Sequence, residues 1–216
     1  MFKTWFFLVQ ALLGVFLVFD SLIVRADFIV YIDPAQTFLR TQEERLGTGN
    51  DTQPIKLSDY GILAGEAIKL ERTGDFSYLG NNDLADMMIG LFSSSNTLLA
   101  SGNFNRVPGA IGIGLSVTTP PTYYNNLATN ISQDFLIANG QFNNYIDVTV
   151  PAGALYLFAA ASDSYYSDNR DNTTGNPLAG TFNLHISTLI PIPASIWLVS
   201  SGLLFAWKVQ CRKRTV

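Results

Sequence analysis

The chain has 216 residues, of which 48% are hydrophobic and only 14% are charged, and its formal net charge is −4. Between Asp27 and Ile190 there are 16 acidic and 7 basic residues, a net charge of −9, which excludes the basic face that nucleic-acid phosphates require. The only cysteine is Cys211, so the central part of the chain has no disulfide and must be stabilised by packing or by a metal.

The first 26 residues have the organisation of a secretory signal peptide. One early cation, Lys3, precedes an apolar run from Trp5 to Phe19, which is shorter than the roughly 20 residues that span a bilayer. The compact residues Val24 and Ala26 then stand where signal peptidase requires them. We predict a signal peptide over residues 1–26 that is cleaved after Ala26; an uncleaved signal anchor is the alternative.

Residues 27–188 are expected to form one exported domain that is long enough to bury a core. Strands and turns are predicted for two segments, Gly65–Leu79 and Met87–Gly102. Loops are predicted for two polar stretches, Gly114–Asn130 and Asp163–Gly180. Only Thr37–Gly47 has a pattern that favours a helix.

The second half of this domain carries the clearest strand signals. The sequence YIDVTV at 145–150 alternates apolar and polar residues, and so does GTFNLHIS at 180–187. Pro151–Gly153 turns the chain into Ala154–Ser162, which is apolar on both faces, so we expect a hairpin here. Several strands separated by Gly, Pro and Asn indicate an all-β domain, an antiparallel β-sandwich.

The chain ends with an apolar segment and a basic cluster. Ile190–Trp207 has 18 residues without a charge, just long enough to cross a bilayer. The cations that follow, Arg212, Lys213 and Arg214, are retained in the cytoplasm by the positive-inside rule. We predict one C-terminal transmembrane helix over about residues 190–207 with the domain outside.

Residues 189–216 also resemble the PEP-CTERM sorting signal of exopolysaccharide-producing Gram-negative bacteria. The matching positions are Pro191, Pro193, Ala194, Trp197, Leu198, Ser201, Gly202, Leu203 and Leu204, followed by the basic cluster. Ile192 stands where the family usually has Glu. The resemblance implies an inner-membrane precursor with its domain in the periplasm, which an exosortase processes and releases to the cell surface or matrix. An ordinary single-pass membrane anchor is the alternative.

The exported domain resembles the domain of many PEP-CTERM proteins in three segments: RTGDFSYLG, NRVPGAIGIG with the later SQDFLI, and VPAGALYLFAAASDSYYSDN. Its last part is similar to the calcium-dependent galactophilic lectins of the galactose-binding-like group. The matching residues there are Asp163, Asp168, Asn169 and Gly180-Thr181-Phe182, with Tyr78 as a source of a carbonyl ligand. The loop is two residues shorter than in those lectins, and RDNTTGNPLA is inserted before the last strand. The resemblance implies a jelly-roll-like sandwich with a calcium site.

The loop DSYYSDN carries the best candidates for chemistry. Asp163, Asp168 and Asn169 offer three hard oxygens within seven residues, which is the kind of ligand that calcium prefers. The alternative is a solvated loop in which these side chains cap turns. Tyr165 and Tyr166 would either stack on a sugar or pack the loop onto the sandwich.

Two weaker features complete the candidates. Asn82, Asp83 and Asp86 form a second acidic group, for which a polar turn is the simpler interpretation. The only histidine, His185, falls on the polar face of the last strand and is not expected to be a general base.

No nucleophile elbow, phosphate loop or zinc spacing is present, so an enzyme is not expected. The sequence therefore predicts a non-enzymatic surface or matrix protein that associates with exopolysaccharide, with calcium as its cofactor. Its partners would be the membrane, signal peptidase and an exosortase. A structural or adhesive protein without a sugar site, and a secreted glycosidase-like enzyme, are the alternatives.

Overall fold

The computed structural model describes residues 23–41, 50–78, 84–114, 122–124, 127–140, 144–171 and 181–191. Asp27–Thr188 forms a compact unit. The predicted signal peptide and C-terminal transmembrane helix lie almost entirely outside the described residues, apart from the short stretches 23–26 and 190–191, which belong to strands. Within the described ranges, no helix has the length and apolar character needed to cross a bilayer.

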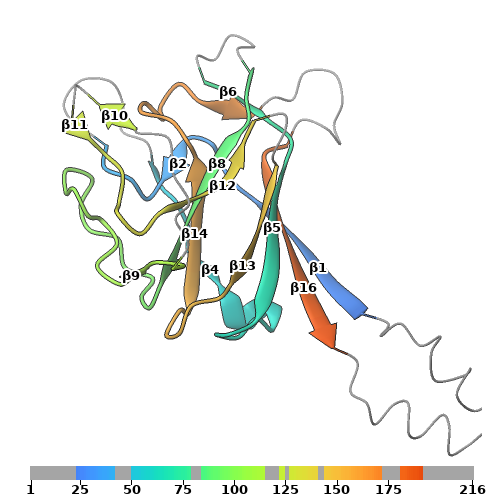
Figure 1. Ribbon diagram of the computed structural model, residues 1–216. Helices are drawn as coiled ribbons and strands as arrows, with labels where there is room; N and C mark the ends of the chain where they lie inside the picture. The colour runs from blue at the N-terminus through green and yellow to red at the C-terminus, as the bar shows by residue number, and fades with distance from the viewer. Residues whose placement is uncertain are drawn as a thin grey trace, which may run out of the picture. The chain divides into compact units, whose positions relative to one another are not determined.

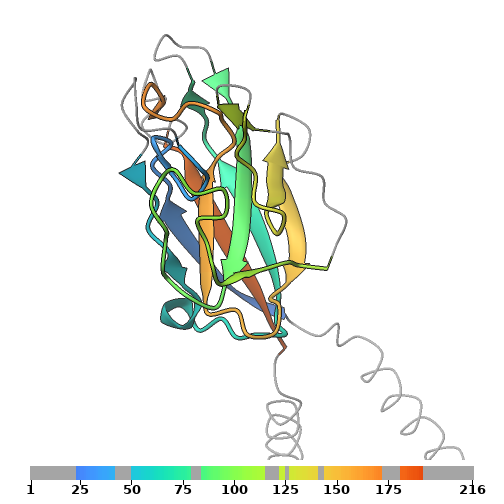
Figure 2. The ribbon, with the colours of Figure 1, turned by 90° about the vertical axis from the view of Figure 1, so that its left-hand side faces the viewer.

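The fold is all-β and its two large sheets are antiparallel, which is consistent with a β-sandwich (Figure 1). The short β2–β3 pair is parallel. One sheet contains four strands in the order β1 (Ile23–Tyr31), β16 (Asn183–Pro191), β5 (Ala67–Thr73) and β13 (Tyr145–Thr149). The other follows the order β12 (Phe135–Asn139), β8 (Met87–Ser93), β14 (Tyr156–Ala161) and β4 (Ile55–Lys56), and β9 (Ala110–Ile111) pairs with β8. Figure 2 shows the two sheets as two layers.

The four-stranded sheet has one apolar and one polar face, as its alternating sequences predict. Its buried apolar side chains lie at every second position, because successive residues of a strand point to opposite faces. They are Ile68 and Leu70 of β5, Val148 of β13, and Leu184 and Ile186 of β16. The predicted strand pattern is confirmed over Tyr145–Thr149 and from Asn183 to Ser187, and His185 is on the polar face as expected.

The central strands of the five-stranded sheet, β8 and β14, are buried on both faces. Phe92 stacks on Phe135 on one face, with 5.5 Å between ring centroids. Phe158, whose position in the β14–β8 register puts it on the opposite face, packs against Phe38 at 6.2 Å. A Cβ on Gly90 would come within 2.9 Å of side-chain atoms of Phe135, so a glycine is required where that ring crosses the strand.

The expected hairpin around Pro151–Gly153 is wrong. β13 pairs with β5 in one sheet, whereas β14 pairs with β8 and β4 in the other, so this turn carries the chain from one layer to the next. The physical reason is burial: β14 is covered on both faces and needs a central position, whereas β13 exposes alternate residues and occupies an edge. Gly153 has φ 81°, a backbone conformation that glycine adopts without strain.

Short elements occupy segments that were expected to be helix or loop. The predicted helix over 37–47 does not form in its described part, because Thr37 ends strand β2 (Gln36–Thr37), which pairs with β3 (Asn50–Asp51), and bends follow. The predicted loops contain three two-residue strands: β10 (Tyr123–Tyr124), β11 (Leu127–Ala128) and β15 (Arg170–Asp171). The rest of their described residues are irregular. β15 pairs with β6 (Phe76–Ser77), which also pairs with β7 (Leu84–Ala85), and a 3-10 turn, η1 (Leu57–Tyr60), follows β4.

A buried arginine connects the loops that cover the five-stranded sheet. The Arg106 side chain is 1% exposed and forms an ion pair with Asp51. Its Nε donates to the carbonyl of Leu99 at 2.9 Å, and its Nη1 donates to the carbonyl of Leu39 at 3.0 Å. Arg106 therefore ties the loop after β8 to the chain around β2 and β3, where the backbone carbonyls would otherwise be buried without donors.

Candidate functional site

The loop between β14 and β15, which we call the acidic loop (residues 163–169), holds three of the four predicted metal ligands. β14 ends at Ala161, and β15 pairs with β6 in a register that places Arg170 opposite Ser77. Continued by one residue, the same antiparallel register places Asn169 across from Tyr78. The β15–β6 ladder thus brings the fourth predicted ligand, Tyr78, next to the acidic loop.

Asp163 begins the acidic loop and shapes it. Its Oδ1 accepts hydrogen bonds from the backbone amides of Ser164 at 2.6 Å and Tyr165 at 3.4 Å, a pattern typical of an Asx turn. Its other carboxylate oxygen, Oδ2, is buried and has no hydrogen-bond partner among the described residues.

Asn169 ends the acidic loop and is fully buried. Its Nδ2 donates to the carbonyl of Pro34 at 2.9 Å, which fixes the side-chain amide. Its Oδ1 and the Oδ1 of Asp168 are both buried and, within the described part of the chain, neither accepts a hydrogen bond. The three residues predicted from the sequence as ligands therefore each contribute one buried oxygen without a donor.

The two carboxylates of the acidic loop are electrostatically unfavourable. Burial raises the pKa of Asp163, and the nearby charge of Asp168 raises it further, while the backbone amides of Ser164 and Tyr165 and the nearby Asn169 amide act in the opposite direction. Burial also raises the pKa of Asp168, against the attraction of Arg170. Both carboxylates therefore lie in a partly desolvated environment that disfavours their charged forms.

Tyr166 does not face solvent, so its predicted role in stacking on a sugar is wrong. The residue is 2% exposed. Its hydroxyl donates to the carbonyl of Ala161 at 3.1 Å and accepts from the amide of Asp163 at 3.4 Å. Tyr166 packs the acidic loop onto the core, which is the packing interpretation that the sequence also offered. Tyr165 is partly exposed, and its role in stacking on a sugar stays a prediction.

The remaining candidates are distributed elsewhere. Asp86 forms an ion pair with Arg72 at 3.6 Å, so its charge is already balanced, and Asn82 and Asp83 lie outside the described residues. His185 Nε2 lies 3.7 Å from Asp27 Oδ1, and His185 stands opposite Glu71 in the β16–β5 register. In the described ranges, no group of three or more His, Cys, Asp or Glu side chains is placed to hold a metal, so a calcium site here depends on amide and carbonyl oxygens as well.

The predicted sorting residues are mostly beyond the described ranges. Pro191 is the last residue of β16. Pro193 and the basic residues Arg212, Lys213 and Arg214 are outside the described part of the chain.

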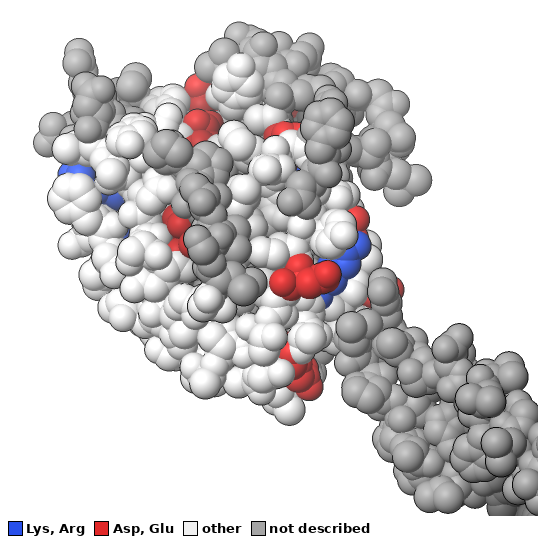
Figure 3. Space-filling view, in the orientation of Figure 1, with Lys and Arg blue, Asp and Glu red and all other residues white. Residues whose placement is uncertain are grey.

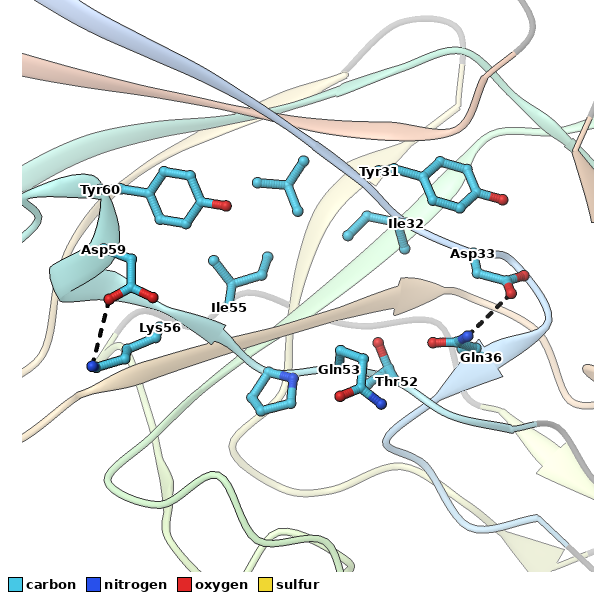
Figure 4. Close-up of a pocket in the computed structure, with 12 residues that line it drawn as sticks. Tyr31, Ile32, Asp33, Gln36, Thr52, Gln53, Ile55, Lys56, Asp59 and Tyr60 are labelled. Atoms are coloured by element: carbon cyan, nitrogen blue, oxygen red, sulfur yellow. Dashed lines mark hydrogen bonds and ion pairs between the residues drawn. The ribbon is translucent and has the colours of Figure 1, made fainter.

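A second feature, which the sequence did not indicate, is a groove of about 400 Å³ between the end of β1 and residues 52–60 (Figure 4). Its lining comes from two segments that are far from the acidic loop in the sequence, and neither segment matches a motif. On the face seen in Figure 3, charged side chains are few and mainly acidic.

No protein-family model, curated protein or solved structure matches this chain. The functional interpretation therefore rests on the residues of the acidic loop, of the groove and of the two ends of the chain.

Proposed function

We propose that this chain is an exported, non-enzymatic protein of the cell surface or extracellular matrix, whose jelly-roll-like sandwich binds calcium and associates with exopolysaccharide. One observation carries the proposal: the buried, donor-free oxygens of Asp163, Asp168 and Asn169 in a single loop. Native proteins rarely bury polar oxygens without partners, so a group of three favours a cation that is bound when the protein functions.

Asp163, Asp168 and Asn169 would hold the calcium ion through these three oxygens. The carbonyl of Tyr78, which the β15–β6 register places across from Asn169, would be a fourth ligand. Calcium takes about six to eight oxygens, so other backbone carbonyls and water would complete its shell. Bound calcium would neutralise the two carboxylates and offer positions that sugar hydroxyl oxygens can fill.

The residues of the loop have separate roles in this proposal. The hydrogen bond from Asn169 Nδ2 to the carbonyl of Pro34 fixes the side-chain amide, so Asn169 Oδ1 needs no reorganisation when a cation binds. Tyr166 fastens the loop to the end of β14. Tyr165 is partly exposed beside Asp163 and would present its ring to a sugar.

The two ends of the chain support export. A signal peptide over 1–26 would direct the domain across the inner membrane, and the apolar segment 190–207 with its basic tail would stop transfer. An exosortase would then cut near Pro191–Pro193 and release the domain, in keeping with the resemblance of the tail to PEP-CTERM signals.

A glycan array probed with the purified protein in calcium and in EDTA tests the proposal. We expect binding to polysaccharide fragments in calcium and weaker binding in EDTA, and we expect Asp168→Asn to behave in calcium as the wild type does in EDTA. Asp147→Asn removes an exposed carboxylate of β13 and serves as the matched control. Calcium-dependent stabilisation without binding to any glycan would favour a structural or adhesive protein, and hydrolysis of the fragments would favour an enzyme.

A further inference from the structure

We propose that the groove between β1 and residues 52–60 is a second glycan-binding site, which holds a neutral oligosaccharide segment without calcium. The ligand class rests on the proposed association with polysaccharide. The location, charge and mode of contact come from the groove itself.

The groove arises where the two layers of the fold end side by side. β1 is the outer strand of the four-stranded sheet and β4 is the outer strand of the five-stranded sheet. They do not pair with each other, and the hollow between them has a volume within the usual range of ligand sites. The apolar side chains of Ile32 and Ile55, which are 5% and 6% exposed, form its floor.

The walls carry the groups that sugars use. Tyr31 and Tyr60 lie at opposite ends of the groove, and the hydroxyl of Tyr60 points along it (Figure 4). The amides of Gln36 and Gln53 lie on the wall opposite β1, and an amide both donates and accepts hydrogen bonds, as a sugar hydroxyl does. Phenol rings over an apolar floor suit the apolar faces of hexose rings.

Hydrogen bonds hold the residues around the end of β1 in place. The Tyr31 hydroxyl donates to Asp171 Oδ2 at 2.5 Å, and the carbonyl of Pro34 accepts from Asn169 Nδ2 at 2.9 Å. Asp33 Oδ2 accepts from Gln36 Nε2 at 3.1 Å, which orients that amide. A wall that is already ordered loses little conformational freedom when a ligand binds.

The charges of the groove select among glycans. Lys56 and Asp59 form an ion pair at 3.5 Å and cancel each other, which leaves Asp33 within the lining and Asp171 behind Tyr31 as net negative charges. A uronate or a sulfated sugar would meet these carboxylates with like charge. The groove therefore fits a chain of neutral hexoses rather than an acidic polysaccharide.

Calorimetric titration of the full chain in a zwitterionic, sugar-free detergent tests this site. The probes are cellohexaose, mannohexaose and galactohexaose, with hexagalacturonate as the acidic counterpart, each in calcium and in EDTA. We expect at least one neutral hexasaccharide to bind in both buffers and to bind more tightly than hexagalacturonate. We expect Gln53→Ala to weaken this binding by about two- to tenfold, the effect of one lost hydrogen bond to the sugar. We expect Tyr31→Phe to weaken it by a similar factor, because the ring loses the bond to Asp171 that holds it in place.

Tyr123→Phe is the matched control, because Tyr123 lies outside the groove and is 52% exposed, as Tyr31 is. Equal melting temperatures of the three variants and the wild type would show that folding is unchanged. The proposal is overturned if no neutral hexasaccharide binds in EDTA, if the groove variants bind as the wild type does, or if hexagalacturonate binds more tightly. If binding is lost in EDTA and the groove variants bind as the wild type does, the acidic loop is the sugar site and the groove is not. If calcium does not raise the melting temperature of the wild type, the calcium site in the acidic loop is refuted, and the groove proposal is unaffected.

Discussion

Replacing Asp168 with asparagine removes one of the two carboxylates of the acidic loop while keeping the shape of the side chain. In calcium at a hundred times its Kd, the wild type should gain about 2.7 kcal/mol in free energy of unfolding, because only the folded chain assembles the site. For a protein of this length, that gain corresponds to a rise of roughly 5–10 °C in Tm. Asp168→Asn should lose most of it, since the ligand that remains at this position is neutral.

The same substitution should leave the metal-free protein as stable as the wild type or slightly more stable. Asp163 and Asp168 repel each other, and the neutral amide relieves that repulsion. Thermal melts followed by circular dichroism in calcium and in EDTA measure both effects, with Asp147→Asn as the control that should follow the wild type. Identical wild-type melting temperatures in the two buffers would refute the calcium site.

Three further predictions follow from the fold and the tail. Burial raises the pKa of Asp163 and Asp168, so the folded metal-free protein binds more protons than the unfolded chain. The contribution of these two carboxyl groups to stability should therefore fall as pH rises from about 4 through their raised pKa values. The gain from calcium should grow over the same range, as melts in both buffers at several pH values would show; a gain independent of pH would contradict this. Arg106→Met should lower the free energy of unfolding by about 3 kcal/mol or more in urea titrations, because buried carbonyls lose their donor. Asp51→Asn should cost less, about 1–3 kcal/mol, because the buried guanidinium loses a charged partner but keeps its carbonyl acceptors. Intact-mass measurement of the released protein should show an end near Pro191–Pro193, and recovery of a chain that still includes Arg214 would rule out this processing.

Local sequence was enough to predict several strands, because their alternation has the period of two that a half-buried strand imposes. This holds for β5, β13 and β16, where apolar side chains at every second position form the inner face. The double burial of β14 was also predictable, since Leu157–Ala161 contains no polar residue. Which sheet each strand would join was not, because the pairing partners are far away in the sequence and the turn after β13 is compatible with a hairpin or a crossover.

The grouping of Asp163, Asp168 and Asn169 in one loop could be predicted for a related reason, whereas their role as calcium ligands stays a prediction. Asp163, Asp168 and Asn169 lie within seven residues, so a single turn of the chain can bring their oxygens together without help from distant elements. Tyr166 lies in the same stretch, but only the packing of the loop onto β14 decided that its ring is buried. The position of Tyr78 next to Asn169 likewise required the β15–β6 ladder.

The groove was decided by the tertiary structure alone. Tyr31 and Gln53 are separated by more than twenty residues, and each belongs to a segment that reads as an ordinary strand or turn. They face one hollow because β1 and β4 are the outer strands of different sheets that end side by side. Sequence patterns determine which residues of a strand are buried, whereas the pairing of distant strands determines which exposed residues share a site.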